Sequence, residues 1–222
     1  MSAQFVDEVD ENIRRLAEAS DLPQKSLDWM MAVGTTGNYP YNFSWLGRPI
    51  IQYPQDMVAM QELIWSIKPD LIIETGIAHG GSLVFSASML ALLDLDDAIA
   101  ADNTIDPKAS SRKVLGIDID IRAHNRAAIE AHPMASRIQM IEGSSIAPET
   151  IAQVKEVVKN YRRILVFLDS NHTHDHVCAE LEAYSPLVTV GSYCVVFDTL
   201  IEDIPAGSFP DKPWDKGNNP RT

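Results

Sequence analysis

The sequence has few cysteines, few basic residues and no long apolar run, and each shortage excludes a class of protein. Only two cysteines occur among 222 residues, without the paired spacing of a zinc finger or a disulfide framework. The 18 basic residues against 31 acidic ones give a formal net charge of −13, which disfavours nucleic acid and anionic membrane surfaces as partners. No apolar run approaches the roughly 18 residues that a membrane span needs, and the N-terminus lacks the layout of a signal peptide. We therefore expect a cytoplasmic protein without a membrane span.

The chain does contain apolar segments that alternate with helical patterns. Short, continuous apolar runs occupy residues 71–74, 114–118, 138–143, 164–169 and 193–198. Helical periodicity lies between them, over residues 82–93, 122–130, 148–159 and 173–184. Continuous apolar strands separated by helices indicate a mostly parallel sheet that is covered on both faces. The expected fold is therefore α/β and doubly wound.

The N-terminal part has a different composition. Apolar residues from Phe5 to Leu16 recur at helical spacing and predict an amphipathic helix that lies on the domain. Residues 33–56 are rich in Gly, Pro, Asn and aromatic residues, which predicts an irregular but packed loop. We expect residues 1–56 to be this helix and aromatic loop packed on the core, and residues 57–222 to form a single globular unit.

An acid and three glycines follow the first predicted strand, in the stretch ETGIAHGGS. In parallel sheets, ligands bind beyond the carboxyl ends of the strands. Those ends carry the acids Glu74, Asp118, Glu142, Asp169 and Asp198. Glycines at a strand-to-helix turn let a cofactor approach the backbone, although the same residues also suit a tight turn in a purely structural domain. The spacing differs from the dinucleotide fingerprint, which also requires an acid about 20 residues later, so NAD is disfavoured.

With these features in order, the sequence resembles the class I S-adenosylmethionine-dependent methyltransferases, whose fold is Rossmann-like. ETGIAHGGS is similar to the glycine loop that contacts the methionyl part of the cofactor, GIDID to the strand end whose acid binds the ribose, and EGSS to the adenine-side segment. The resemblance makes residues 57–222 the cofactor-binding methyltransferase domain. The cofactor-binding residues that it implies are Glu74, Gly76, Gly80, Gly81, Ser82, Asp118, Gly143, Ser144, Ser145 and Asp169.

A narrower resemblance covers most of the chain, from Trp45 to Pro220. The segments FSWLGRPIIQYPQD, LDSNHTHDHVCAEL and YSPLVTVGSYCVVFDT resemble the cephalosporin hydroxylase family, which includes rhamnosyl O-methyltransferase-like proteins. Members of that family resemble magnesium-dependent O-methyltransferases more than oxygenases. They usually continue into a helix and a closing β-hairpin, so the resemblance implies that the C-terminal hairpin is missing here.

Two aspartates at neighbouring strand ends suggest a metal site. Mg²⁺ prefers oxygen ligands, typically one or two carboxylates, and the expected ligands are Asp169, Asp198 and Thr199. Two carboxylates at adjacent strand tips repel each other unless a cation lies between them. Each aspartate would alternatively cap the helix that follows its strand. The family pattern often has an acid before the second aspartate, where this chain has Phe197, so one carboxylate ligand is in doubt.

The predicted catalytic residues are His172 and Asp169, and His172 is the candidate general base. In the related catechol O-methyltransferases a lysine stands three residues after the corresponding aspartate, and His172 takes that position. An imidazole that titrates near neutral pH accepts a proton from a hydroxyl whose pKa has been lowered. Alternatively, His172 or His174 satisfies backbone groups at a helix start, or the histidines bind a softer metal.

The resemblance implies an O-methyltransferase that uses S-adenosylmethionine and Mg²⁺ on a hydroxyl of a sugar or secondary metabolite, within carbohydrate or lipopolysaccharide biosynthesis. The acceptor is then a small hydroxylated molecule, and a homo-oligomer is compatible with the sequence. A non-catalytic cofactor-binding or scaffold protein and a metal-dependent hydroxylase remain alternatives. Residues 209–222, rich in Pro and Gly, are expected to be irregular and mobile, as a lid would be.

Overall fold

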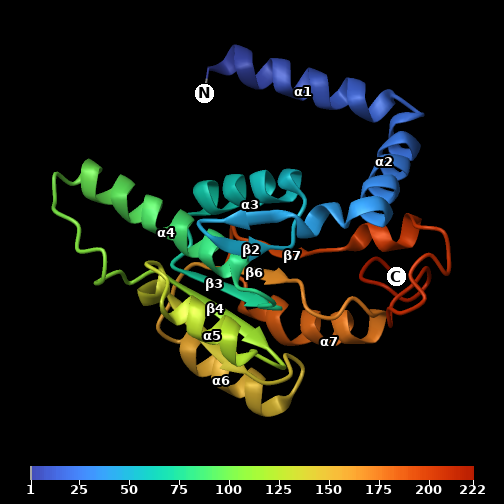
Figure 1. Cartoon of the computed structure of the whole chain (residues 1–222). Coiled ribbons are helices and arrows are strands. Elements are labelled where there is room, and N and C mark those ends of the chain that lie inside the picture. Colours follow the sequence, from blue (N-terminus) through green and yellow to red (C-terminus); the bar gives the residue numbers. More distant parts are fainter. Residues whose placement is uncertain (1) are drawn as a thin grey trace. The chain divides into compact units, whose positions relative to one another are not determined.

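The computed structural model describes residues 2–222 (Figure 1). Packing divides the chain into two compact units, Met1–Tyr39 and Pro40–Thr222. The first contains helices α1 (Ala3–Glu18) and α2 (Leu22–Gly37). Ser2 caps α1, because its hydroxyl accepts a hydrogen bond from the N–H of Phe5 at 3.3 Å. The helix predicted near the N-terminus is therefore confirmed as α1, whereas its packing on the domain stays a prediction, as does a boundary at residue 56.

Helix α2 is a departure from the sequence prediction, which expects a loop to begin at residue 33. The structure continues the helix to Gly37, and Asn38 ends it in the left-handed conformation with φ 48°. The glycines and threonines in the last turns of α2 have low helix propensity, so the composition alone predicts a loop there. Thr35 fits this position because its hydroxyl donates to the carbonyl of Met31, one turn back, at 2.7 Å.

The second unit is built on a five-stranded sheet in which every strand pair is parallel. The strand order is β5 (Ile138–Glu142), β4 (Lys113–Asp118), β3 (Leu71–Thr75), β6 (Ile164–Leu168) and β7 (Cys194–Val196). Every residue of β3 and β6 is buried, as expected for central strands covered on both faces. The predicted doubly wound α/β fold is confirmed, with strand ends within a few residues of the expected ones.

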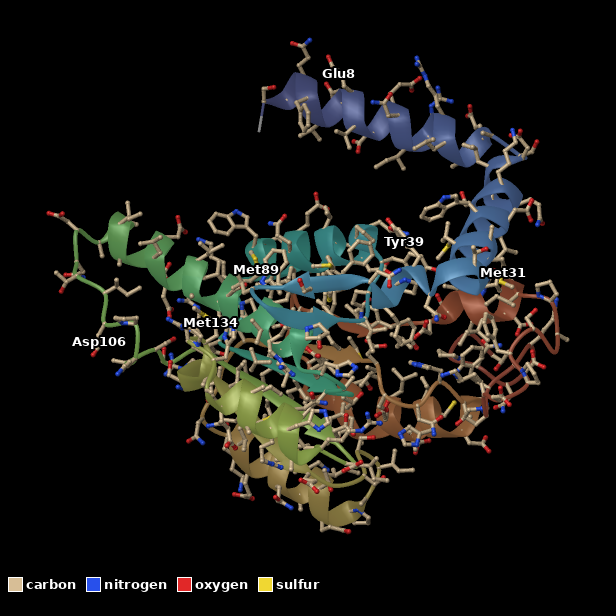
Figure 2. The ribbon with its side chains drawn as sticks, in the orientation of Figure 1. Glu8, Met31, Tyr39, Met89, Asp106 and Met134 are labelled. Atoms are coloured by element: carbon tan, nitrogen blue, oxygen red, sulfur yellow. The ribbon has the colours of Figure 1, made fainter. Side chains whose placement is uncertain are left out.

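Helices cover both faces of this sheet (Figure 1). The helices are α3 (Pro54–Ile67), α4 (Gly81–Ala100), α5 (Ala123–Glu130), α6 (Pro148–Val158) and α7 (His174–Tyr184). One apolar cluster contains residues of α3, α4 and α5 with Ile72 of β3, and the other contains residues of α6 and α7 with Leu71 and Ile73. Neighbouring residues of β3 thus point to opposite faces, as the pleat requires. Figure 2 labels Met89 of α4 and Met134, which both pack in the first cluster.

A short antiparallel hairpin precedes α3, where sequence analysis predicts an irregular loop. Strands β1 (Phe43–Trp45) and β2 (Arg48–Ile50) are joined by two residues, Leu46 and Gly47, which both have positive φ. Such a pair forms the tight turn whose twist matches a hairpin. The hairpin packs on α4, because the indole N–H of Trp45 donates to the Ser88 hydroxyl at 3.0 Å. Residues 43–50 of the aromatic segment therefore form a two-stranded sheet beside α4.

The sheet reverses its winding direction between β3 and β6. The chain leaves β3 into α4 on one face and leaves β6 into α7 on the other, so the loops after these adjacent strands separate. Ligands of doubly wound sheets bind in the crevice at such a point. The glycine loop after β3 and the loop that begins at Asp169 therefore face the same crevice.

Candidate active site

The loop after β3 begins with Gly76, which has φ +91°. A Cβ atom there would lie 2.0 Å from the backbone oxygen of Asp169, so no other residue fits beside the end of β6. A Cβ at Gly81 would lie 2.2 Å from the carbonyl oxygen of Pro49 in the hairpin, and one at Gly80 would meet Ile129. The three glycines thus allow close packing of the protein itself. Their predicted role toward a cofactor stays a prediction.

Asp118, at the end of β4, holds the same loop from one side. Its Oδ2 accepts hydrogen bonds from the backbone N–H groups of Ile77 at 2.8 Å and Ala78 at 3.1 Å, while Oδ1 accepts from the N–H of Asp120 at 3.2 Å. One carboxylate oxygen is therefore already engaged by the loop. Asp118 also lines a cavity, where its predicted contact with a ribose stays a prediction.

Two residues that sequence analysis misses hold this loop from the other side. Arg48 of β2 donates from Nε to the carbonyl of His79 at 3.0 Å, and Asn125 of α5 donates to the carbonyl of Ala78 at 2.9 Å. Arg48 also donates to the Asn125 side-chain oxygen at 3.1 Å, so the two form one network. No motif identifies them, because their partners lie 31 and 47 positions away in the chain.

Glu74 is buried within β3, with 3% of its surface exposed. The Ser82 hydroxyl donates to one carboxylate oxygen, and the other oxygen, Oε2, has no partner in the described chain. Burial raises the pKa of Glu74 to about 7, against the opposing effect of the Ser82 hydrogen bond. A buried oxygen without a donor is an unusual arrangement and fits a site that a ligand completes.

Three predicted residues meet beyond the ends of β6 and β7. Asp169, His172 and Asp198 each offer a ligand atom, and these atoms lie within 4.8 Å of one another. The Nε2 atom of His172 is 3.1 Å from Oδ2 of Asp198. The third predicted metal ligand, Thr199, follows Asp198 at the start of a short helix, is exposed and lines neither of the two cavities described below. A role for Thr199 stays a prediction.

The cluster is strongly acidic. Desolvation raises the pKa of Asp169 well above its usual range, and the charges of Asp198, Glu74 and Asp56 raise it further. Asp56, in the first turn of α3, has its own pKa raised by burial and by Asp198. Gln52 opposes the rise in the pKa of Asp169, because it donates a hydrogen bond of 2.7 Å to Oδ2 of that carboxylate. Gln52 and Asp56 are a second pair that sequence analysis misses, since Gln52 lies 117 positions from its partner.

Two cavities meet at this cluster. The first, of about 280 Å³, lies between the glycine loop, the segment before α3 and the C-terminal segment, and its lining includes Gly81 and Ser82. The second, of about 450 Å³, lies beside Asp118, Ser144 and Ser145. The residues that line both are Gly76, Ala78, Asp169, Ser170, His172, Lys212 and Trp214. The predicted catalytic pair thus lies at the boundary between the cavities.

The adenine-side segment has a further structural role. The Ser145 hydroxyl lies 3.1 Å from Nε2 of His176, and its carbonyl accepts from the Tyr184 hydroxyl at 2.6 Å. His176 in turn lies 3.5 Å from the buried carboxylate of Glu180, to which Ser170 also donates at 2.7 Å. Ser145 is therefore largely engaged by α7. Gly143 lines neither cavity, and a Cβ there would lie 2.6 Å from the Thr150 hydroxyl.

Comparison with known proteins shows which sequences and structures this chain resembles. A family model described as Rhamnosyl O-methyltransferase/CmcI matches residues 37–222. The rhamnosyl O-methyltransferase of Mycobacterium leprae is 30% identical over 171 residues, which are 76% of this chain and 66% of that protein. The corresponding protein of Mycobacterium bovis is 30% identical over 154 residues, 68% of this chain and 54% of the relative. The chain therefore spans between about half and two thirds of the length of these relatives.

A solved structure shows the same fold. The O-methyltransferase from Bacillus cereus, described as in complex with SAH, superposes with a TM-score of 0.50 at 16% identity, covering 88% of this chain and 74% of that chain. Within residues 2–222, no helix combines the length and the apolar character that crossing a bilayer requires.

Proposed function

Because the chain belongs to the rhamnosyl O-methyltransferase/CmcI family, we propose that it transfers a methyl group from S-adenosylmethionine to a hydroxyl of a sugar. The proposal is supported by relatives named as rhamnosyl O-methyltransferases that are 30% identical to it. Since the chain spans only part of their length, the proposal concerns the reaction of this domain. The match of the family model to residues 37–222 confirms the family that the sequence motifs indicate.

The two cavities suit the two halves of this reaction. We assign the adenosyl half of the cofactor to the second cavity, beside Asp118 and Ser144, and the methionyl half to the region of Gly76 and Ser82. Glu74 itself lines neither cavity, but the Ser82 hydroxyl that donates to it belongs to the lining of the first, and its Oε2 has no partner among the described residues. The acceptor then occupies the remainder of the first cavity, next to the boundary.

The acidic cluster fits a divalent cation. Asp169 and Asp198 would hold it, since hard cations such as Mg²⁺ prefer carboxylate oxygens, and Gln52 orients the first of these carboxylates. Bound Mg²⁺ would balance the carboxylate charges and lower the pKa of an acceptor hydroxyl. Phe197, where the family pattern often has an acid, packs edge-on against Phe167 with ring centroids 5.9 Å apart and supplies no ligand.

His172 is the group that takes the acceptor proton. Asp198 lies beside its Nε2, so a proton on Nε2 is held by the carboxylate and the lone pair of Nδ1 is the free base. Transfer of the acceptor proton to Nδ1 yields an imidazolium that the adjacent Asp198 stabilises. As the sugar oxygen forms its bond to the methyl carbon, the bond from that carbon to the cofactor sulfur breaks, and S-adenosylhomocysteine is released.

The observation that carries this proposal is the meeting of Asp169 and His172, which line both cavities, with Asp198, which lines the first. We would measure S-adenosylhomocysteine binding by calorimetry, and then methyl transfer to a panel of rhamnosides with and without EDTA. The proposal expects binding, transfer, and loss of transfer on chelation. Absence of cofactor binding would overturn it.

One observation favours a second candidate, a non-catalytic cofactor-binding protein. Phe197 removes a carboxylate from the position where the family pattern often has one. The same experiment separates the two candidate functions. A non-catalytic protein binds S-adenosylhomocysteine but transfers no methyl group to any rhamnoside, even when the rhamnoside is in large excess.

A further inference from the structure

Trp214 holds a particular place in the two cavities. It belongs to the C-terminal segment, and of the Trp, Tyr and Phe residues in the described chain it alone lines both cavities. Its indole is half-buried and meets the imidazole of His172 edge-on, with ring centroids 6.4 Å apart. Phe209 supports the indole from within the same segment, with ring centroids 5.5 Å apart. A large flat side chain therefore stands beside the proposed base, where the two cavities meet.

A single amide side chain connects Trp214 to the helix that follows His172. Asn218 accepts a hydrogen bond from the backbone N–H of His174 at 3.0 Å, and its Nδ2 donates to the carbonyl of Pro213 at 3.1 Å. Its backbone also pairs with that of Asp215, at 2.9 and 3.2 Å. The residues on both sides of Trp214 are thus held by Asn218, which is itself bound to the start of α7.

Hydrogen bonds also connect the rest of the segment. Asn219 is fully buried and donates to Oε2 of Glu202 at 2.6 Å, and the N–H of Gly217 donates to the same oxygen at 2.8 Å. The N–H of Gly207 donates to the Asp215 carboxylate at 2.9 Å. The backbone is irregular, as the Pro- and Gly-rich sequence predicts, and side-chain amides and carboxylates supply the partners that regular secondary structure would provide. The mobility of this segment stays a prediction. A wall that is ordered before binding loses little entropy when a ligand packs on it.

From this arrangement we propose that Trp214 is the acceptor-specificity residue: its indole forms the flat wall on which the ring of a glycosyl acceptor packs, and Asn218 positions it. The inference rests on the proposed function, which it deepens by naming a ring-shaped acceptor. Aromatic side chains provide a large, rigid, apolar surface, and the C–H face of a pyranose ring is complementary to it. Packing there places a ring hydroxyl beside His172 and Asp169.

The first cavity also explains why the ring belongs on this side of the boundary. Tyr41, Tyr53 and Phe197 line the first cavity in addition to Trp214. In the second cavity Trp214 is the one Trp, Tyr or Phe among the described lining residues, and the rest of the lining combines polar side chains around Asp118 with Ile117, Ile119 and Pro213. An acceptor in the first cavity therefore meets aromatic surface together with a few polar groups. This combination is typical of sites that select a ring by shape and orient it by hydrogen bonds.

The test measures two affinities in four variants. Methyl α-L-rhamnopyranoside is titrated in the presence of saturating S-adenosylhomocysteine by saturation-transfer NMR, and S-adenosylhomocysteine itself is titrated by calorimetry. The variants are Trp214→Ala, Trp214→Phe, Asn218→Ala and the control Trp65→Ala. Trp65 is a matched control, since it is 44% exposed on α3 and lines neither cavity.

Trp214→Ala is expected to weaken sugar binding about tenfold, which corresponds to about 1.4 kcal/mol, and to leave S-adenosylhomocysteine binding within about twofold. Trp214→Phe should retain most of the sugar affinity, and Asn218→Ala should lose an intermediate part of it. Unchanged sugar affinity in both Trp214→Ala and Asn218→Ala would overturn the inference, as would an equal or larger loss of S-adenosylhomocysteine affinity, which would place the indole in the cofactor site. Wild-type protein that binds no S-adenosylhomocysteine would instead overturn the proposed function, and the inference with it.

Discussion

Nε2 of His172 lies 3.1 Å from Oδ2 of Asp198, which pairs an imidazole that lines both cavities with a carboxylate that lines the first. The pair resembles the base and orienting acid of other enzymes, in which the acid fixes the tautomer and stabilises the protonated ring. Asp198 itself has a φ of +57°, a backbone conformation that is uncommon outside glycine. Strained backbone of this kind often marks functional positions.

Loss of the base should slow methyl transfer without affecting cofactor binding. We expect His172→Ala to lower kcat by about 10²- to 10⁴-fold, the usual contribution of a general base. The Kd for S-adenosylhomocysteine should stay within about twofold, as calorimetry would measure, because Asp118 and Ser144, the predicted adenosyl contacts in the second cavity, are unchanged in the variant. His124→Ala is the matched control, since His124 is exposed on α5 and lines neither cavity. Equal activity of the two variants would exclude His172 as the base.

A methyl group at Gly76 should destabilise the fold far more than one at another glycine of similar conformation. Gly76→Ala places a Cβ 2.0 Å from the Asp169 carbonyl, whereas Gly47→Ala, at φ +85°, meets nothing within 4 Å. Both variants carry the strain of positive φ, about 1 kcal/mol, and only the first also forces the ends of β3 and β6 apart. Urea unfolding should show a loss for Gly76→Ala that exceeds the loss for Gly47→Ala by at least about 2 kcal/mol. Comparable losses would contradict the close approach of the two strands.

Arg48 should affect cofactor binding although it lines neither cavity. Arg48→Ala removes the donors to the His79 carbonyl and to Asn125, so the glycine loop keeps Asp118 and Asn125 but loses its third side-chain support. We expect S-adenosylhomocysteine affinity to fall by about tenfold and the free energy of unfolding by about 1–3 kcal/mol, typical of buried acceptors left without a donor. Arg126→Ala provides the control, because Arg126 forms ion pairs with Glu130 and Glu142 on the surface of α5. Calorimetry showing the same affinity for both variants would remove Arg48 from the set of positioning residues.

Glu74 should make the unliganded protein less stable as the pH rises. Its folded pKa of about 7 lies above the usual value of 4.5, so between these values the folded state holds a proton that the unfolded state has released. The free energy of unfolding therefore falls through this window, and the full penalty, about 3 kcal/mol, is present above pH 7. Below pH 4.5 both states are protonated and Glu74 contributes no pH dependence.

Glu74→Gln should flatten this part of the stability profile, because the amide imitates the protonated acid. Thermal or urea unfolding at pH 5 and pH 8 would compare the variant with wild type, and the exposed Glu149→Gln would serve as control. The decrease from pH 5 to pH 8 should be smaller in Glu74→Gln by up to about 3 kcal/mol and unchanged in the control. Parallel profiles for all three proteins would show that Glu74 ionises normally in the fold.

Much of the architecture was predictable because it depends on local sequence. Apolar runs such as residues 164–168 are buried on both faces, and their length and continuity report this directly. Because the strands are parallel, their carboxyl ends lie at the same edge of the sheet. For this reason Asp169 and Asp198, 29 positions apart in the chain, were expected side by side, and the structure brings them together with His172.

Local reasoning failed where composition and conformation disagree. Helix α2 extends over Thr35, Thr36 and Gly37, whose propensities suggest a loop. The sequence does not predict the turn at Leu46 and Gly47, because a leucine seldom adopts positive φ. The aromatic and β-branched residues around the turn nevertheless suit a hairpin.

The sequence by itself determined the parallel sheet, the family and the acids at the strand ends, since each follows from patterns within a few neighbouring residues. Only the tertiary structure decided what surrounds those acids. Gln52 reaches Asp169 across 117 positions, Arg48 and Asn125 support the glycine loop from two other elements, and Asn218 holds Trp214 beside His172. Such contacts are specified by how separate elements pack, and a polar side chain carries no local signal of the distant partner that it will meet.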